Sequence, residues 1–116
     1  MPAATRDFTA QIIRVIDGDT VEVSLDVGFG LTLRDHVRVL GINCPEMSTP
    51  DGPRARARTA ELLPIGSYVV AKCASHRDKY GRVLADFVVG NATLGEILLA
   101  EGLAVPLPYG GPQWMS

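Results

Sequence analysis

The fold is decided by residues 8–25, which read FTAQIIRVIDGDTVEVSL. Residues 8–16 are rich in β-branched side chains, and they end at the turn signal Asp17-Gly18. Residues 20–25 then alternate apolar and polar side chains with the period of two that is typical of a half-buried strand. The stretch therefore predicts two antiparallel strands joined by a tight turn.

Further strands and helices follow this hairpin. The sequence predicts strands at residues 31–40, 67–73 and 83–89 and helices at residues 53–63 and 94–101. Pro53 suits the first position of the earlier helix. Thr93 and Glu96 fit a capping box at the start of the later helix, because each side chain can accept a hydrogen bond from the backbone N–H of the other residue.

The loop between the second and third strands carries the sequence Gly28-Phe29-Gly30. Its glycines permit the positive φ angles of a turn. We expect a hairpin loop with one buried aromatic side chain, that of Phe29.

Five short strands, with helices after the third and the fifth, indicate an α+β fold that is mainly β. The arrangement suits a five-stranded Greek-key barrel of the oligonucleotide-binding type, the OB-fold, with two helices. We expect one domain at residues 8–105, with a flexible arm at residues 1–7 before it and a Pro- and Gly-rich tail at residues 106–116 after it.

Composition excludes several classes of function. The 116 residues are 47% apolar and 21% charged, and no apolar run approaches the roughly 18 residues of a membrane span. The formal net charge of -2 argues against sequence-independent coating of duplex nucleic acid, which requires a basic surface. Two cysteines, Cys44 and Cys73, are too few for a disulfide framework, so we expect buried or neutral thiols.

A local basic cluster can still bind phosphate in an acidic protein. Arg54, Arg56 and Arg58 form such a cluster on the first predicted helix. Arg54 and Arg58 lie one turn apart on one face of that helix, whereas Arg56 points elsewhere. A solvated surface and a substrate tether both fit this pattern.

Three short motifs gather acidic and basic side chains that suit a phosphodiester substrate. The motifs are Asp17-Gly18-Asp19-Thr20, Arg38-Val39-Leu40-Gly41-Ile42-Asn43-Cys44-Pro45-Glu46 and Asp78-Lys79-Tyr80-Gly81-Arg82. Carboxylate oxygens bind hard divalent cations, and the planar guanidinium of arginine matches a phosphate in a bidentate fork. Phosphodiester hydrolysis needs an in-line water, a base and positive charge on the phosphoryl oxygens, so the combination indicates a metal-assisted nuclease.

The order and spacing of the motifs resemble the staphylococcal-nuclease-like (thermonuclease) family. Members of that family carry D-G-D-T, then R-x-x-x-[IV]-D-x-P-E, then D-K-Y-G-R, and the resemblance here extends from about residue 8 to residue 104. The Asp-x-Gly-Phe-Gly loop at residues 26–30 is similar to phage and bacterial members. The resemblance implies a calcium-dependent nuclease that cleaves DNA, RNA or both with low base specificity, since the recognised group is the phosphate.

The resemblance also implies a role for each site residue. Glu46 would orient and deprotonate the attacking water, and Arg38 and Arg82 would clamp the phosphate. From its strand alone, Arg38 could equally form a salt bridge at the rim of the barrel. The residues expected beside the nucleotide are Lys79, Tyr80 and Tyr109.

The implied metal ligands are Asp19, Asn43 and the backbone carbonyl of Cys44, with Asp17 supporting the metal loop behind them. Taken alone, two aspartates around a glycine are also an ordinary turn. Asn43 stands where the family pattern has an aspartate. An amide oxygen can coordinate calcium, but the first shell loses one formal negative charge, so we expect a weaker calcium site than is usual in the family.

The alternative function is a catalytically inactive nuclease-like module that binds nucleic acid or protein. A structural component of a phage particle or another bacterial assembly is a further form of this alternative. Retention of Glu46, Arg38 and Arg82 together favours the enzyme. No secretory segment is visible at the start of the sequence, which favours a cytoplasmic or virion-associated location.

Overall fold

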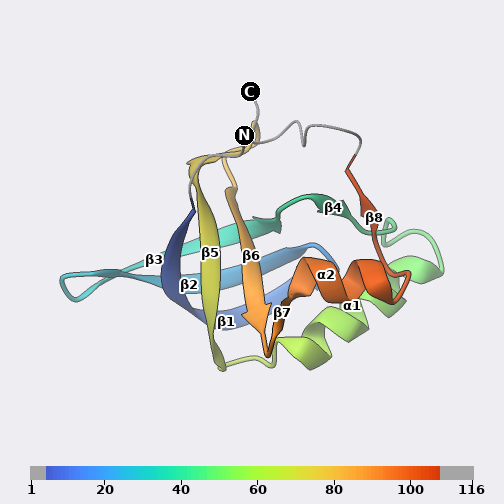
Figure 1. Ribbon diagram of the computed structural model, residues 1–116, viewed down its shortest axis with the longest axis horizontal. Coiled ribbons are helices and arrows are strands. Elements are labelled where there is room, and N and C mark those ends of the chain that lie inside the picture. The colour runs from blue at the N-terminus through green and yellow to red at the C-terminus, as the bar shows by residue number, and fades with distance from the viewer. Residues whose placement is uncertain (1–4, 108–116) are drawn as a thin grey trace.

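A closed five-stranded β-barrel with two helices packed on one side of it is built from residues 5–107, the part of the chain that the computed structural model describes (Figure 1). In chain order the elements are β1 (Arg6–Asp17), β2 (Thr20–Gly28), β3 (Leu31–Val39), β4 (Ile42–Asn43), α1 (Asp51–Leu62), β5 (Tyr68–Arg77), β6 (Val83–Val89), β7 (Ala92–Thr93), α2 (Leu94–Ala100) and β8 (Val105–Pro106).

The strands pair in the order β3-β2-β1-β5-β6. All of these neighbours are antiparallel, and the predicted hairpin of β1 and β2 turns between Asp17 and Thr20. The barrel closes where residues 37–39 of β3 pair in parallel with residues 83–85 of β6. This order confirms the OB-type Greek-key barrel predicted from the sequence.

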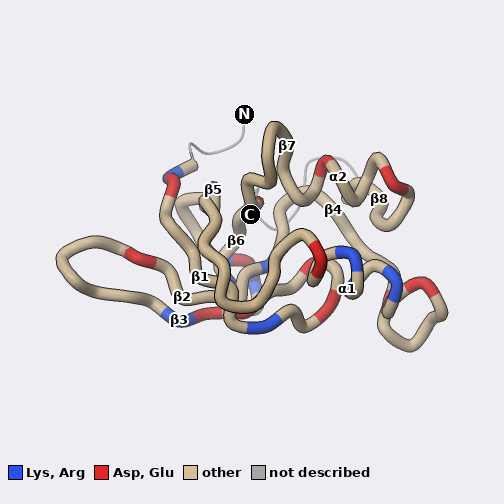
Figure 2. Tube along the Cα trace, turned by 90° about the horizontal axis from the view of Figure 1, so that it is seen from below, with Lys and Arg blue, Asp and Glu red and all other residues tan. Residues whose placement is uncertain are grey.

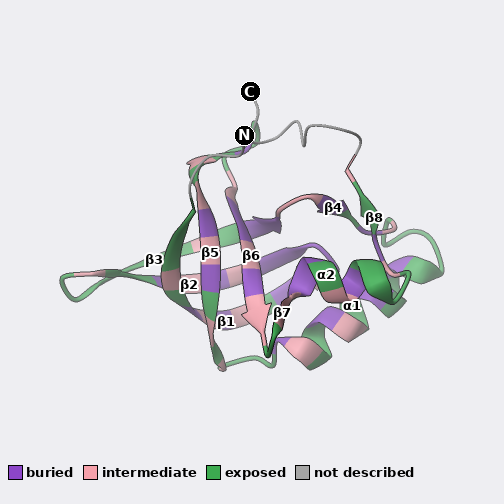
Figure 3. Ribbon diagram, in the orientation of Figure 1, coloured by how far each residue is buried: buried purple, intermediate pink, exposed green. Residues whose placement is uncertain are grey.

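The alternation along β2 separates the barrel interior from its outer face. Val21, Val23 and Leu25 are buried, whereas Glu22 and Ser24 between them are partly exposed. Figure 3 shows the buried segments along the barrel strands and on the sides of the helices that face the barrel. The largest fully buried side chains are Phe87, Ile12, Ile42, Leu63, Leu84, Leu94 and Leu98. Removal of this apolar surface from water is the main stabilising contribution to the fold.

Helix α1 lies very close to the β1–β2 turn. It begins at Asp51, slightly before the predicted start, and its buried face consists of the small residues Gly52, Ala55 and Thr59. The Thr59 hydroxyl donates a hydrogen bond of 2.8 Å to the backbone carbonyl of Gly18. The small side chains allow the helix to approach the turn that carries Asp19.

Gly18 itself admits no side chain. A Cβ atom at this position would lie 2.8 Å from the Sγ atom of Cys44 and 2.9 Å from the Cβ atom of Ala55. Both distances are shorter than a van der Waals contact. The turn, the segment after β4 and helix α1 therefore meet at Gly18.

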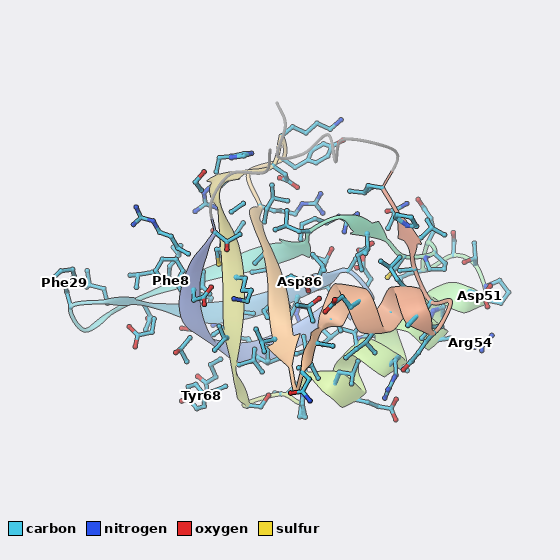
Figure 4. All side chains as sticks on the ribbon, in the orientation of Figure 1. Phe8, Phe29, Asp51, Arg54, Tyr68 and Asp86 are labelled. Carbon is cyan, nitrogen blue, oxygen red and sulfur yellow. The ribbon has the colours of Figure 1, made fainter. Side chains whose placement is uncertain are left out.

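The start of helix α2 is fixed in the way the sequence predicts. The Glu96 N–H donates to the Thr93 hydroxyl at 3.3 Å, and the Thr93 N–H donates to the Glu96 carboxylate at 2.8 Å, which completes the capping box. Asp86 of β6 adds a third contact, because its Oδ1 atom accepts a hydrogen bond of 3.1 Å from the Gly95 N–H (Figure 4). The short helix is thus tied to the barrel at its first turn.

The prediction that Phe29 is buried is wrong. Beyond the closed part of the barrel, β2 and β3 continue as a two-stranded arm (residues 26–33), and Phe29 lies fully exposed at its tip (Figure 4). The reason is geometric: β3 pairs with β6 only at residues 37–39, and β1 pairs with β2 no further than Asp26, so neither β6 nor β1 extends along the tip of the arm. Phe29 also has a positive φ of 60°, an uncommon conformation for a residue other than glycine.

Strand β5 is longer than predicted. It runs to Arg77 instead of ending at Cys73, so His76 lies within the strand. The His76 Nε2 atom is buried and has no hydrogen-bond partner among the described residues. In the described part of the chain, no helix combines the length and the apolar composition needed to cross a membrane.

The exposure of Phe29 predicts a contrast between two phenylalanines. Phe29→Ala should change the free energy of unfolding by less than about 0.5 kcal/mol, because the ring contributes no buried surface. Phe87→Ala removes the same ring from the core and should cost about 3–5 kcal/mol. Urea unfolding followed by circular dichroism measures both values. A cost above about 1 kcal/mol for Phe29→Ala would contradict the exposed position.

Candidate active site

The three sequence motifs meet at one cleft of about 390 Å³. The residues that line it are Asp17, Asp19, Thr20, Arg38, Asn43, Cys44, Pro45, Glu46, Met47 and Arg82. The first motif comes from the β1–β2 turn, the second from the end of β3 through β4, and the third from the connection between β5 and β6. Residues far apart in the sequence are therefore brought together, as the motif spacing predicts.

Asp19 is buried, and both its carboxylate and its backbone N–H have partners in the cleft. Its Oδ2 atom accepts a hydrogen bond of 2.8 Å from the Cys44 N–H and lies 3.3 Å from the Nη1 atom of Arg38, while its own N–H donates to Asp17 at 3.1 Å. Burial raises the pKa of Asp19 to about 6 from its ordinary 3.8; the neighbouring Asp17 adds to the rise, and Arg38 and the Cys44 N–H oppose it. Any further positive charge in the cleft would favour the ionised form of Asp19.

Arg38 is buried in the cleft and is not a salt bridge at the rim. Only 5% of its surface is exposed. Its guanidinium donates to the Val39 carbonyl and to the Oδ1 atom of Asn43, each at 3.1 Å, in addition to its pairing with Asp19. These contacts fix the planar guanidinium before any substrate binds.

The donors proposed for a metal are all oxygen atoms: the Asp19 carboxylate, the Asn43 amide oxygen and the Cys44 carbonyl. Oxygen donors suit calcium. Within residues 5–107, no group of three or more His, Cys, Asp or Glu side chains is placed to hold a metal ion, which agrees with an amide at position 43 in place of a carboxylate. The donor chemistry therefore fits a calcium ion, but with little negative charge to hold it.

The two thiols are inert, as the sequence predicts. Cys44 and Cys73 are both free and buried. Burial raises the pKa of Cys44 to about 12, with the nearby Asp19 charge adding to the rise. Burial likewise raises the pKa of Cys73 to about 11. Both side chains are neutral at physiological pH, and Cys44 can offer a metal only its backbone carbonyl.

Glu46 differs from Asp19 and Arg38 because it is exposed in the cleft. Its backbone is nevertheless held firmly. The Glu46 carbonyl accepts hydrogen bonds from the N–H and the hydroxyl of Thr49, at 2.9 Å and 2.7 Å. A Cβ atom at Gly52 would collide with the same carbonyl, so the first turn of α1 packs directly against it. Glu46 is thus a solvent-accessible carboxylate on a fixed backbone.

Arg82 is positioned by a residue to which the sequence analysis gave no role, Asp78. The Oδ2 atom of Asp78 accepts a hydrogen bond of 2.7 Å from the Arg82 Nε atom, and its Oδ1 atom accepts from the N–H groups of Tyr80 and Arg82. Burial would raise the pKa of Asp78, but these hydrogen bonds outweigh it and hold the pKa below its ordinary value. In the sequence, the only indication of this pairing was that Asp78 and Arg82 lie four residues apart within the third motif.

The residues expected beside a nucleotide lie at the same motif. The Lys79 Nζ atom is 5.2 Å and the Arg82 Cζ atom 5.4 Å from the centre of the Tyr80 ring, and the ring is largely exposed. Neither Lys79 nor Tyr80 lines the cleft itself. Tyr109, the third residue expected there, lies outside the described residues.

The arginines of α1 are held by partners within the protein. Arg54 pairs with Asp51 at 3.2 Å, and Arg58 pairs with Glu101 at 2.8 Å. The Arg56 Nε atom donates to a backbone carbonyl of β1 at 3.3 Å. These contacts favour the solvated surface over the substrate tether.

Comparison with known proteins agrees with this geometry. A family model described as "Staphylococcal nuclease homologue" matches residues 36–111, a range that contains Arg38, Asn43, Glu46 and Arg82. The chain belongs to the staphylococcal nuclease family. The resemblance found in the motifs is thereby confirmed.

Several relatives of this staphylococcal nuclease family member are known from bacteria. The SPbeta prophage-derived endonuclease YokF of Bacillus subtilis is 37% identical over 78% of this chain and 31% of its own length. Endonuclease YncB of the same organism is 37% identical over 78% of this chain and 44% of its own length. A micrococcal nuclease of Shigella flexneri is 32% identical over 93% of this chain and 63% of its own length. The chain thus spans about a third to under two thirds of the relatives it matches.

The raised pKa of Asp19 predicts how stability changes with pH. A carboxyl group with a higher pKa in the folded state binds more protons when folded, so its contribution to the free energy of unfolding falls as pH rises from about 4 to about 6. Between these pH values, the free energy of unfolding of the wild type should fall by on the order of 2–3 kcal/mol more than that of Asp19→Asn. Urea unfolding at several pH values in the presence of a chelator measures the difference. Parallel pH profiles for the two proteins would contradict the prediction.

The hydrogen bonds of Asp78 predict a structural cost for its removal. Asp78→Ala leaves two backbone N–H groups and the Arg82 Nε atom without their acceptor, so the free energy of unfolding should fall by about 1–3 kcal/mol. Asp26→Ala is the matched control, since Asp26 accepts one hydrogen bond in the exposed β2–β3 arm. Chemical denaturation should show the larger decrease for Asp78→Ala, and equal decreases would argue against its role in positioning Arg82.

Proposed function

We propose that this protein is a calcium-dependent nuclease that hydrolyses phosphodiester bonds of DNA, RNA or both. The observation that carries the proposal is the cleft itself, in which fixed Arg38 and Arg82 lie around the exposed carboxylate of Glu46. The relatives named endonuclease, thermonuclease and micrococcal nuclease support the same activity.

The two arginines supply the positive charge that a phosphoryl group needs. Arg38 is fixed by Asp19, the Val39 carbonyl and Asn43, and Arg82 is fixed by Asp78. Donors that are fixed in advance stabilise the developing negative charge without reorganising during the reaction. Under this proposal the guanidinium groups bind the non-bridging oxygens of the scissile phosphate.

Glu46 acts as the general base in the proposed reaction. A base must reach the attacking water and must be held in place while the phosphate binds beside it. The hydrogen bonds from Thr49 and the packing of Gly52 fix the Glu46 backbone, while the side chain stays open to water. Glu46 takes the proton as the water oxygen bonds to phosphorus; the P–O bond to the leaving oxygen breaks, and that oxygen takes a proton from solvent.

Asp19, Asn43 and the Cys44 carbonyl are the residues that would hold the calcium ion. When bound, the ion supplies positive charge that polarises the phosphoryl oxygen and neutralises charge in the transition state. Asp17 supports the loop, because it accepts the hydrogen bond from the Asp19 N–H. The amide at position 43 makes the site weaker than one with two carboxylates.

Low base specificity follows from the residues that bind the substrate. The arginines recognise phosphate, which carries no sequence information. Tyr80 with its neighbour Lys79 offers an exposed aromatic face, and every base can stack on such a face. DNA and RNA are both accommodated by this chemistry.

A second candidate is a nuclease-like module that binds nucleic acid or protein without cutting it. The observation that favours it is Asn43, because an amide in place of a carboxylate removes one negative charge from the residues that would hold a metal ion. Activity assays separate the two candidates.

The proposed function predicts three coupled results in a calcium titration. Wild-type protein should cut single-stranded DNA, duplex DNA or RNA only when calcium is present. Glu46→Gln should reduce the rate by about 10²- to 10⁴-fold, because the base is removed. Asn43→Asp should lower the calcium concentration required by about tenfold, because one negative charge is restored.

Controls make this experiment decisive. A chelator should abolish cutting by every variant, and Asp51→Asn, a similar change at an exposed carboxylate of α1, should behave as wild type. Absence of cutting by both the wild type and Asn43→Asp would overturn the nuclease and favour the binding module.

A further inference from the structure

On the outer face of β2 and β3, cross-strand pairs of side chains form successive rows that extend away from the cleft. Thr20 is paired with Arg38, and both line the cleft. Moving along the two strands away from the cleft, the next outward-facing pair is Glu22 with His36 and the one after it is Ser24 with Arg34. Side chains two residues apart in a strand share one face and lie about 7 Å apart, so these rows lie about 7 and 14 Å from the cleft row.

Two arginines on this face share a single carboxylate. The Arg14 Nε atom lies 3.2 Å from Glu22 Oε1, and the Arg34 Nε atom lies 2.8 Å from Glu22 Oε2. The side chains of Arg14 and Arg34 are 60% and 66% exposed, whereas that of Glu22 is only 14% exposed. Each ion pair uses only the Nε atom of its arginine, so both guanidinium groups present their outer edges to solvent.

This arrangement differs from the other ion pairs of the described residues. Elsewhere in residues 5–107, no carboxylate pairs with more than one basic side chain: Lys72 with Asp7 and Arg77 with Asp35 are examples. Glu22 alone pairs with two cations, so the group of Arg14, Glu22 and Arg34 carries a net charge of +1. Exposed His36 lies directly opposite Glu22 in the same row. Figure 2 shows basic and acidic segments close together at β3, in a chain whose net charge is -2.

We propose that Arg14, Arg34 and His36 form a second phosphate-binding site, which holds the nucleic-acid strand beyond the scissile phosphate. The proposal rests on the proposed nuclease function, because the strand enters this face from Arg38 in the cleft. The face spans about 14 Å from Arg38 to Arg34, enough for about four nucleotides at the rise of about 3.4 Å per nucleotide in a duplex strand, and for roughly two when the strand is unstacked and extended. Glu22 lies between the two arginines and lowers the net positive charge that they present to a phosphate.

Binding of single-stranded oligonucleotides tests this site separately from cleavage. The parent protein is Glu46→Gln in calcium, which should bind without cutting, and fluorescence anisotropy is measured with labelled chains of two and twelve nucleotides at several salt concentrations. Adding Arg34→Ala or Arg14→Ala should weaken binding of the twelve-nucleotide chain by about three- to tenfold, with a smaller effect for the two-nucleotide chain. The slope of log affinity against log salt should decrease by about 0.7 for each phosphate that the variant no longer neutralises.

Two further variants distinguish a phosphate site from a structural ion cluster. Glu22→Gln removes the shared negative charge and should tighten binding of the twelve-nucleotide chain, whereas disruption of a purely structural cluster would leave binding unchanged or weaker. Lys72→Ala removes a cation from a surface ion pair on β5 and should stay within about twofold of the parent. Thermal unfolding of each variant confirms that it is folded.

The outcomes separate this proposal from the proposed function. If the wild type cuts nucleic acid but the Arg14 and Arg34 variants bind like the parent, the second site is wrong and the nuclease stands. If nothing is cut but these variants bind more weakly and with less salt dependence, the second site stands and the nuclease is wrong. Lack of measurable binding by the parent, or an equal decrease in affinity for Lys72→Ala, would overturn the second site.

Discussion

The close packing around Gly18 is the constraint on which the rest of the site depends. A β-turn, the segment that follows β4 and a helix share a space that has no room for one methyl group, because Cys44 Sγ and Ala55 Cβ already occupy it. The Thr59 hydroxyl then binds the Gly18 carbonyl from the helix side. With this packing in place, Asp19 is brought to the Cys44 N–H, and the two halves of the cleft are joined by a hydrogen bond of 2.8 Å.

Among the charged residues of the cleft, some are held in ion pairs, and one, Glu46, is exposed to water. Asp19 and Arg38 are buried together, so each offsets part of the desolvation cost of the other. Asp78 does the same for Arg82 at the opposite side. Glu46 is left exposed, with only its backbone fixed. Charges that must stay in place are thus paired inside the protein, and the group proposed to exchange a proton is the one that meets water.

Local sequence patterns predicted most of the strands and helices, because alternation, turn residues and helix caps act over only a few neighbouring residues. The β1–β2 hairpin follows from alternation and a turn signal, and the capping box at Thr93 was confirmed with both of its hydrogen bonds. The three motifs also contain most of the residues that line the cleft, although Lys79 and Tyr80 of the third motif lie outside its lining. What the patterns could not supply was burial that depends on distant partners. Phe29 was expected in the core by its hydrophobicity, but the arm that carries it extends past the strands that would cover it.

Side-chain partners were the other limit of sequence reasoning. Arg38 lies in an alternating strand and could have been a rim residue; its burial depends on Asp19, which lies 19 positions earlier in the sequence, and on the fold that joins them. The i, i+4 spacing could have indicated the pairing of Asp78 with Arg82, but the hydrogen bonds that Asp78 accepts from the backbone N–H groups of Tyr80 and Arg82 are not visible in any side-chain motif.

The parallel pairing of β3 with β6 has a consequence for how the cleft is assembled. This seam joins Val37 to Val83 and Arg38 to Leu84, across more than 40 positions of the chain, so it is among the pairings that cost the most chain entropy to form. Arg38 lies in the seam, and Arg82 directly precedes it. The two arginines are therefore brought to one cleft only when this closing seam of the barrel has formed. Under the proposed function, binding of the scissile phosphate requires the closed barrel and not the β1–β2 hairpin or the helices alone.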